Sequence, residues 1–208
     1  MQPTNSAPGK PPVPQGYTTP WRERMPMPDV ATLSDAQRQA ADGLIAGPRK
    51  GVYGPFLPLL RSPALLQHVA GLGEYLRFGS MLDARIRELS ICAAARHVTN
   101  QFEWMMHAPL AVNAGVAPAT LVALHEGRRP AGLPADEELA LGFVAELLHN
   151  HGVSEPTYLA AVESFTEQGV VELTTLVGYF VMVSWLMNVA HTPPQKSMQG
   201  DGLRAFPL

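Results

Sequence analysis

The chain has 208 residues, of which 46% are hydrophobic and 16% are charged, and its formal net charge is -3. This length suits one ordinary domain with a full core, and the slightly negative charge excludes a broad basic surface for nucleic acid. Cys92 is the single cysteine, which excludes an internal disulfide, a CxxC redox pair and a cysteine-rich zinc site. A reducing, cytoplasmic location is expected.

Proline sets the N-terminal segment apart from the rest of the chain. Residues 1–30 contain eight prolines, which deny the backbone the donors that helices and sheets use. The segment also lacks the basic-then-apolar pattern of a secretion signal. We predict an extended arm at 1–30 with Tyr17 and Trp21 as anchors, a helical domain at 31–192 and a tail at 193–208.

Apolar residues recur at helical spacing along the domain, which predicts an all-α fold. Ser34 and Gln37 form a capping box that begins a first helix, and Gly47 ends it. Residues 47–63 are rich in Gly and Pro, so we predict an irregular loop of the kind that often borders a site. A second helix is predicted over residues 63–77.

The next two predicted helices carry most of the candidate chemistry. Asp83 is the expected N-cap of a helix over residues 82–98, and a break near Thr99 and Asn100 leads into the following helix. Pro109 lacks the amide proton that the helical hydrogen-bond ladder needs. We therefore expect it to kink or end this helix.

Turn signals predict the remaining helices at about 118–127, 136–149 and 154–167, with Gly169 before a long apolar helix. Residues 173–190 carry no charge. Their polar members, such as Thr174 and Asn188, favour a buried core or subunit-interface helix over a membrane span. Residues 82–111 and 170–190 look too apolar for one small bundle to cover, which predicts a homo-oligomer.

The stretch FEWMMHAPLA, residues 102–111, places Glu103 and His107 four positions apart. Side chains with this spacing share one face of a helix. An exposed ion pair would be ordinary, but the neighbours are nearly all apolar, and a buried acid or base needs a partner or a polar cavity. The pair indicates either a functional cleft or a satisfied structural pair.

The preceding helix supplies Arg85, Arg87, Glu88 and Arg96. The arginines are candidates for bidentate binding of a substrate carboxylate, although a solvated helix face or ion pairs between subunits would account for them as well. Cys92 lies one turn beyond Glu88, where a lone cysteine in an apolar helix is typical of core packing. The sequence has no HExxH pattern, and no metal site is expected.

Residues 85–116, RIRELSICAAARHVTNQFEWMMHAPLAVNAGV, resemble the core of the carboxymuconolactone decarboxylase and alkylhydroperoxidase D-like superfamily. The shared pattern is an Arg-Glu dipeptide early in one helix, a short turn, and a His followed by small residues that end in Ala-Gly-Val. Flanking segments extend the similarity over about residues 40–190. The resemblance implies a single-domain helical bundle of the alkylhydroperoxidase D-like type that forms trimers or hexamers, with sites near subunit contacts.

The resemblance also implies roles for particular residues. In the peroxidase branch, a Glu and a His serve a CxxC pair; Glu88 and His107 match the Glu and the His, but Asn100 and Glu103 occupy the thiol positions. Thiol peroxidase activity is not expected, because neither residue supplies a thiolate. The decarboxylase branch has a Glu four residues before the His, as Glu103 is here, and Glu88 is a departure from that branch.

We therefore expect a cofactor-free acid/base lyase, a decarboxylase that acts on a carboxylated lactone or a related carbonyl-containing carboxylic acid, with no nucleic-acid or membrane partner. His107 would be the general acid/base, Glu103 would tune its protonation and Glu88 would relay or orient. The residues expected to bind substrate are Arg85, Arg87, Arg96, Asn100, Trp104 and Phe56.

Three alternatives remain open on the sequence. The same Glu and His pair would suit an isomerase or a lactone hydrolase. The pair would be merely structural in a non-catalytic, oligomeric binding protein. In the third alternative, Glu88, Glu103 and His107 would bind a metal ion.

Overall fold

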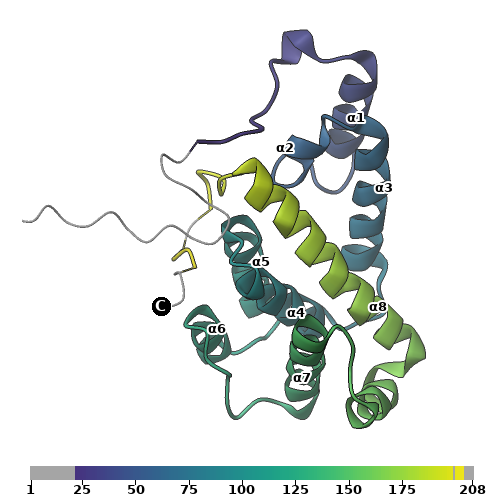
Figure 1. Ribbon diagram of the computed structural model, residues 1–208, viewed down its shortest axis with the longest axis vertical. Helices are drawn as coiled ribbons and strands as arrows, with labels where there is room; N and C mark the ends of the chain where they lie inside the picture. Colours follow the sequence, from purple (N-terminus) through teal and green to yellow (C-terminus); the bar gives the residue numbers. More distant parts are fainter. Residues whose placement is uncertain (1–21, 199, 204–208) are drawn as a thin grey trace, which may run out of the picture.

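The computed structural model describes residues 22–198 and 200–203, and every regular element within them is helical (Figure 1). This confirms the predicted fold class. The predicted anchors Tyr17 and Trp21, with most of the predicted arm, lie outside the described residues. The α-helices are α1 (Asp35–Ala46), α2 (Phe56–Leu59), α3 (Pro63–Glu74), α4 (Ala84–His97), α5 (Gln101–Asn113), α6 (Pro118–His125), α7 (Ala135–Asn150) and α8 (Glu155–Ala190).

The long helix α8 organises the molecule. Figure 1 shows it running diagonally across the fold, with α1 to α3 toward one side and α4 to α7 toward the other. Helix α4 packs against α5, α7 and α8, and one core cluster joins buried side chains from α1, α3, α4, α7 and α8. By length and composition α8 is apolar enough to cross a membrane, but more than half of its most apolar 18-residue window is buried inside the bundle. Burial of this extent fits the predicted core helix.

Local capping signals begin the helices where the sequence predicts. The Ser34 hydroxyl accepts a hydrogen bond from the Gln37 amide, and the Gln37 side chain accepts one from the Ser34 amide, at 3.2 and 2.9 Å. Asp83 caps α4 by accepting from the Arg85 amide at 2.8 Å. Both caps satisfy amide groups that the first turn of a helix leaves without intrahelical acceptors.

Three boundary predictions need correction. Helix α5 continues through Pro109 to Asn113, so of the two predicted outcomes, a kink or an end, the end is wrong. A proline removes only one hydrogen bond of the helical ladder, and Ala111 beyond it is buried. The segment 47–63 includes one helical turn, α2. The break in α8 lies at Thr166, with φ 66° and ψ 168°, rather than at Gly169. Gly169 is helical and allows close packing, because a Cβ there would lie 2.8 Å from the Phe165 Cβ.

A π-helical turn, Tyr75–Gly79, extends α3 and is anchored to α8 by Glu172. Tyr75 and Ser80 each donate a hydroxyl hydrogen bond of 2.6 Å to the Glu172 carboxylate, and the Met81 amide donates one of 2.8 Å. Burial alone would raise the pKa of Glu172, but these hydrogen bonds and one from Gln168 lower it to about 2. Glu172 therefore holds the turn in place as a charged acceptor, and π-helical turns are frequent at functional sites.

Candidate active site

His107 lies between two carboxylates contributed by two helices. Its Nδ1 is 2.6 Å from Oε2 of Glu88 on α4, and its Nε2 is 3.3 Å from Oε2 of Glu103, one turn earlier on α5. The shared helical face predicted for Glu103 and His107 is confirmed. The packing of α4 against α5 brings in Glu88, nineteen positions before His107. We call these three residues the relay.

The relay is buried, with Glu88, Glu103 and His107 only 6%, 3% and 2% exposed. Burial would lower the pKa of His107, but its contacts with Glu103 and Glu88 outweigh that effect and raise the pKa above 6.5. Burial would likewise raise the pKa of Glu88, but the hydrogen bond and charge of His107, with Arg77 and Arg87, lower it below 4.5. Both shifts favour a charged imidazole hydrogen-bonded to a charged Glu88.

Helix α5 is positioned by Asn100, which caps it and ties it to α8. The Asn100 side-chain oxygen accepts a hydrogen bond from the Glu103 amide at 2.9 Å. Its amide group donates to the Asn188 side chain at 2.9 Å and to the Ser184 carbonyl at 3.2 Å. Phe180 of α8 packs edge-on against the His107 ring, 5.0 Å between centroids. The relay therefore sits on α4 and α5, and the Asn100 side chain fixes α5 to α8.

A small cavity of about 30 Å³ lies beside Glu103 and His107. Its volume suits one or two groups the size of water. Its lining comes from the segment before α2, from α2 itself, the π-helical turn, α5 and α8. The residues are Arg49, Tyr53, Pro55, Phe56, Arg77, Phe102, Glu103, Met106, His107, Tyr179, Phe180 and Val183. We call it the relay cavity; its lining joins an acid and a base to two guanidinium groups.

Two of the predicted substrate-binding residues lie near the relay. Phe56 lines the relay cavity, where a substrate-binding residue would be placed. Arg87 lies next to the relay, with its Nε 4.0 Å from Oε1 of Glu88, but its Nη1 donates to the Leu82 carbonyl and it does not line the cavity.

The other four predicted substrate-binding residues lie elsewhere. Arg85 forms ion pairs with Asp136 and Glu137 of α7, at 2.5 and 2.6 Å. Arg96 lines a separate groove. The Asn100 side chain caps α5 and donates to α8, and Trp104 packs in a second core cluster. The fold does not bring these four side chains to the relay cavity.

Four polar residues at the relay cavity were not predicted from the sequence: Arg49, Tyr53, Arg77 and Tyr179. Arg49 stands in the segment predicted to border a site, which was the available signal. For Tyr179, the available signal was its polar hydroxyl group in the uncharged stretch of residues 173–190. Arg77 offers no local signal, because only the π-helical turn carries it to the cavity.

The geometry of the relay does not favour the metal alternative. Each ring nitrogen of His107 faces a different carboxylate, so the three side chains form a line and do not converge on one point. Across the described ranges, no group of three His, Cys, Asp or Glu residues has an arrangement that could hold a metal ion.

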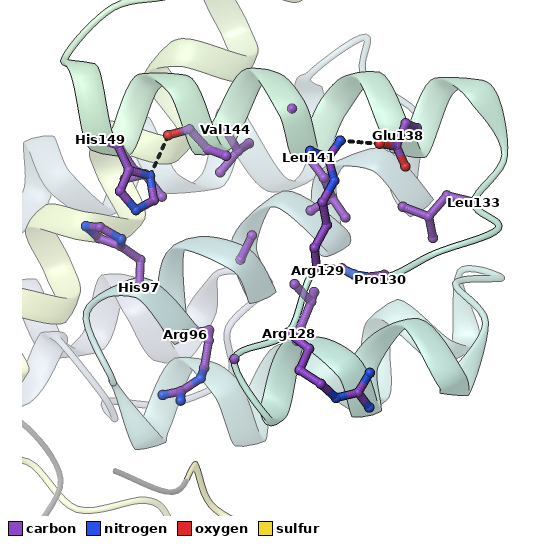
Figure 2. Close-up of a pocket in the computed structure, with 16 residues that line it drawn as sticks. Arg96, His97, Arg128, Arg129, Pro130, Leu133, Glu138, Leu141, Val144 and His149 are labelled. Carbon is purple, nitrogen blue, oxygen red and sulfur yellow. Dashed lines mark hydrogen bonds and ion pairs between the residues drawn. The ribbon is translucent and has the colours of Figure 1, made fainter. Parts of the chain in front are cut away.

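A larger groove of about 480 Å³ lies between α4, α7 and the segment after α6 (Figure 2). His97 and His149 meet edge-on at one end, with ring centroids 5.2 Å apart. Arg129 pairs with Glu138, and His149 Nδ1 lies 2.7 Å from the Ala145 carbonyl oxygen. The groove contains no relay residue, and size alone does not identify a reactive site. The coupled acid and base of the relay make the smaller cavity the candidate active site.

Comparison with known proteins agrees with the family resemblance. Residues 63–146 match the model of the Carboxymuconolactone decarboxylase family, a segment that includes Glu88, Glu103 and His107. No curated protein matches the sequence.

Three solved structures are similar in fold. An alkylhydroperoxidase AhpD core, an uncharacterized peroxidase-related protein from Ralstonia eutropha JMP134, is 19% identical with a TM-score of 0.70, covering 84% of this chain and 93% of that one. An uncharacterized peroxidase-related protein from Silicibacter sp. TM1040 is 16% identical with a TM-score of 0.68, covering 92% and 97%. A protein of unknown function from Agrobacterium tumefaciens is 15% identical with a TM-score of 0.57, covering 66% and 94%. Residues 63–146 of the chain are thus similar to the carboxymuconolactone decarboxylase family, and its fold is similar to that of the alkylhydroperoxidase D-like structures.

Proposed function

We propose that this protein is a cofactor-free acid/base enzyme, a decarboxylase that acts on a carboxylated lactone or a related carbonyl-containing carboxylic acid. One observation carries the proposal: the His107 imidazole bridges two buried carboxylates beside a cavity. Titratable groups held in such an environment are typical of catalytic acids and bases. The family match supports the same reaction class.

The proposed reaction breaks the bond between the carboxylate carbon and its neighbour. The electron pair of that bond moves toward the carbonyl group, CO2 leaves, and an enolate forms. A proton then adds to the enolate carbon. Glu103 and His107 line the cavity and Glu88 does not, so the proton comes from His107, directly or through Glu103, and solvent restores it. Glu88 acts as a positioning residue that keeps the imidazole charged.

The state of Cys92 argues against a thiol peroxidase. Its side chain is fully buried. Burial, with the nearby negative charges of Glu88 and Glu103, raises the pKa of its thiol. Peroxide reduction needs an accessible thiolate and a second thiol to resolve the oxidised product. The sequence has no second cysteine.

Substrate access requires movement near the relay cavity, because about 30 Å³ does not hold a lactone ring. The segment before α2 supplies Tyr53 and Pro55 to the lining. Lys50 and Gly54 in the same segment have φ values of 58° and 57°. We infer that this segment shifts outward to admit substrate, since loop motions of this kind gate many enzymes.

The exposed face of α8 supports assembly into a homo-oligomer. Val171, Met182, Trp185 and Val189 are exposed at helical spacing along one side of the helix. Gly178 lies in the same row with open space beside it, which allows another helix to approach closely. Exposed apolar residues that recur along one side of a helix are typical of a protein interface. We propose that a second copy of the chain covers it.

Release of CO2 tests the proposed function. The full chain is incubated with carboxylated lactones and β-keto acids, and CO2 is measured. Wild type should release CO2 from at least one substrate, and His107→Gln should lower kcat by at least about 100-fold, the usual contribution of a general acid. Arg38→Gln, an exposed ion-pair residue of α1, is the control and should match wild type.

Other products would overturn the proposal. Exchange of substrate hydrogen for solvent deuterium without CO2 would indicate an isomerase. Ring opening without CO2 would indicate a lactone hydrolase. Equal turnover by His107→Gln and wild type would remove His107 from the mechanism.

A further inference from the structure

The relay cavity contains more positive charge than the relay alone can neutralise. Arg49 and Arg77 line it together with Glu103 and His107. With His107 charged, the imidazolium and two guanidinium groups outnumber the carboxylates of Glu88 and Glu103 by one charge. Two neighbouring residues add one charge of each sign, and these two charges cancel. Arg87 lies 4.0 Å from Glu88, and Glu74 lies 3.5 Å from Arg49. One further negative charge would balance the cavity.

The two arginines are poorly paired with carboxylates. Arg49 donates to the Ala70 carbonyl at 2.9 Å and stacks over the Phe56 ring at 4.8 Å. Its carboxylate contact is the distant one to Glu74, whose side chain is half exposed. Arg77 lies over the Phe78 ring, and among the described residues its buried Nε has no hydrogen-bond partner. A buried donor without an acceptor costs free energy, so an anionic oxygen placed there is favoured.

Tyr179 adds a neutral donor to the same wall. Gly73 on α3 makes room for it, since a Cβ at that position would collide with the Tyr179 hydroxyl. Burial raises the pKa of Tyr179 to about 12, despite the opposing effect of Arg49. The phenol therefore keeps its proton over the working pH range and is able to donate a hydrogen bond.

We propose that Arg49, Arg77 and Tyr179 form an oxyanion subsite that holds the oxygen on which enolate charge develops. This inference rests on the proposed function. The leaving carboxylate is the less suitable occupant: strong binding there would stabilise the substrate more than the transition state, because charge leaves that group as CO2 forms. Donors aimed at the carbonyl oxygen gain strength as the reaction proceeds. The volume of the cavity also suits a single oxygen-bearing group.

A phenolate probe tests the subsite without any turnover. p-Nitrophenol is added at a pH below the pKa of the free phenol, and the visible absorbance of its phenolate is recorded during titration with the full chain. Wild type should bind the probe and increase its ionised fraction. Arg77→Gln and the isosteric Tyr179→Phe should each weaken phenolate binding about tenfold or more. Arg77→Lys should recover part of the loss, and the exposed control Arg38→Gln should match wild type.

Two outcomes would overturn the subsite: wild type fails to raise the ionised fraction, or both Arg77→Gln and Tyr179→Phe bind phenolate as well as wild type. Phenolate binding without CO2 release from any substrate would retain the subsite and reject the decarboxylase. Where turnover is measurable, Arg77→Gln should lower kcat about 100-fold with little change in KM. A rise in KM at constant kcat would assign Arg77 to the leaving carboxylate and reject the proposal.

Discussion

At the scale of single residues, the protonation of His107 governs the site. Two carboxylates stabilise its cation against the cost of burial, and the cation in turn keeps Glu88 ionised. Each group therefore depends on the other, and removal of one partner from a buried pair costs more than the pair contributes. The same coupling ties stability and activity to pH.

The raised pKa of His107 predicts a stabilising contribution that is complete below pH 6.5 and is lost as pH rises through its folded-state value. The lowered pKa of Glu88 predicts a contribution present above pH 4.5 and lost as pH falls through its folded-state value. Both contributions are present between pH 4.5 and pH 6.5. The difference in unfolding free energy between wild type and His107→Gln should therefore be largest in this interval, on the order of 3 kcal/mol. Urea denaturation across pH checks this.

Activity should follow the same titration. If His107 donates the proton, kcat falls as pH rises through its raised pKa. A stability difference that stays constant from about pH 5 to about pH 9 would contradict the charged imidazole.

At the scale of elements, the site depends on how helix ends are joined. Asn100 is the link between α5, which carries Glu103 and His107, and α8, which carries Tyr179 and Phe180. Glu172 similarly anchors the π-helical turn that carries Arg77. The relay cavity is thus lined by elements whose ends are held by buried polar side chains.

Asn100→Ala should destabilise the fold by about 2 to 4 kcal/mol. It removes an N-cap worth about 1 kcal/mol and leaves buried partners on α8 unsatisfied, which adds about 1 to 3 kcal/mol. Ser34→Ala is the matched control, because Ser34 caps α1 at an exposed site and should cost only about 1 kcal/mol. Urea denaturation followed by circular dichroism compares them. Equal losses would mean that Asn100 serves as a cap alone.

At the scale of the whole molecule, the described part of the chain leaves the apolar row on α8 exposed. Trp185 is 60% exposed and Val189 is 56% exposed, whereas the opposite side of the helix is buried in the core. The family resemblance, which implies trimers or hexamers, leads to the same expectation as this surface.

Trp185→Glu should therefore reduce the mass of the native assembly, because a charge in an apolar interface is costly to bury. Leu159→Glu is the control: Leu159 is 56% exposed on the first part of α8, outside this row, and its substitution should leave the mass unchanged. Light scattering coupled to gel filtration measures both. A monomeric wild type, or a Trp185→Glu variant of unchanged mass, would remove this face from the assembly.

The helices with clear caps were predictable because their hydrogen bonds join residues close in sequence. Ser34 with Gln37 and Asp83 with Arg85 are such pairs. Pro109 and Gly169 misled the sequence prediction for the opposite reason: packing with distant residues decides whether a helix survives a proline or passes through a glycine. Arg85 likewise looked available for substrate until α7 supplied Asp136 and Glu137.

By itself, the sequence determined the helical class, the pairing of Glu103 with His107 and the lack of a second thiol, since helical periodicity, i to i+4 spacing and composition are local properties. Only the tertiary structure decided that Glu88 completes the relay through a hydrogen bond, and that Arg49, Arg77 and Tyr179 meet beside it. These side chains lie far apart along the chain, and the packing of α3, α4, α5 and α8 is what brings them together.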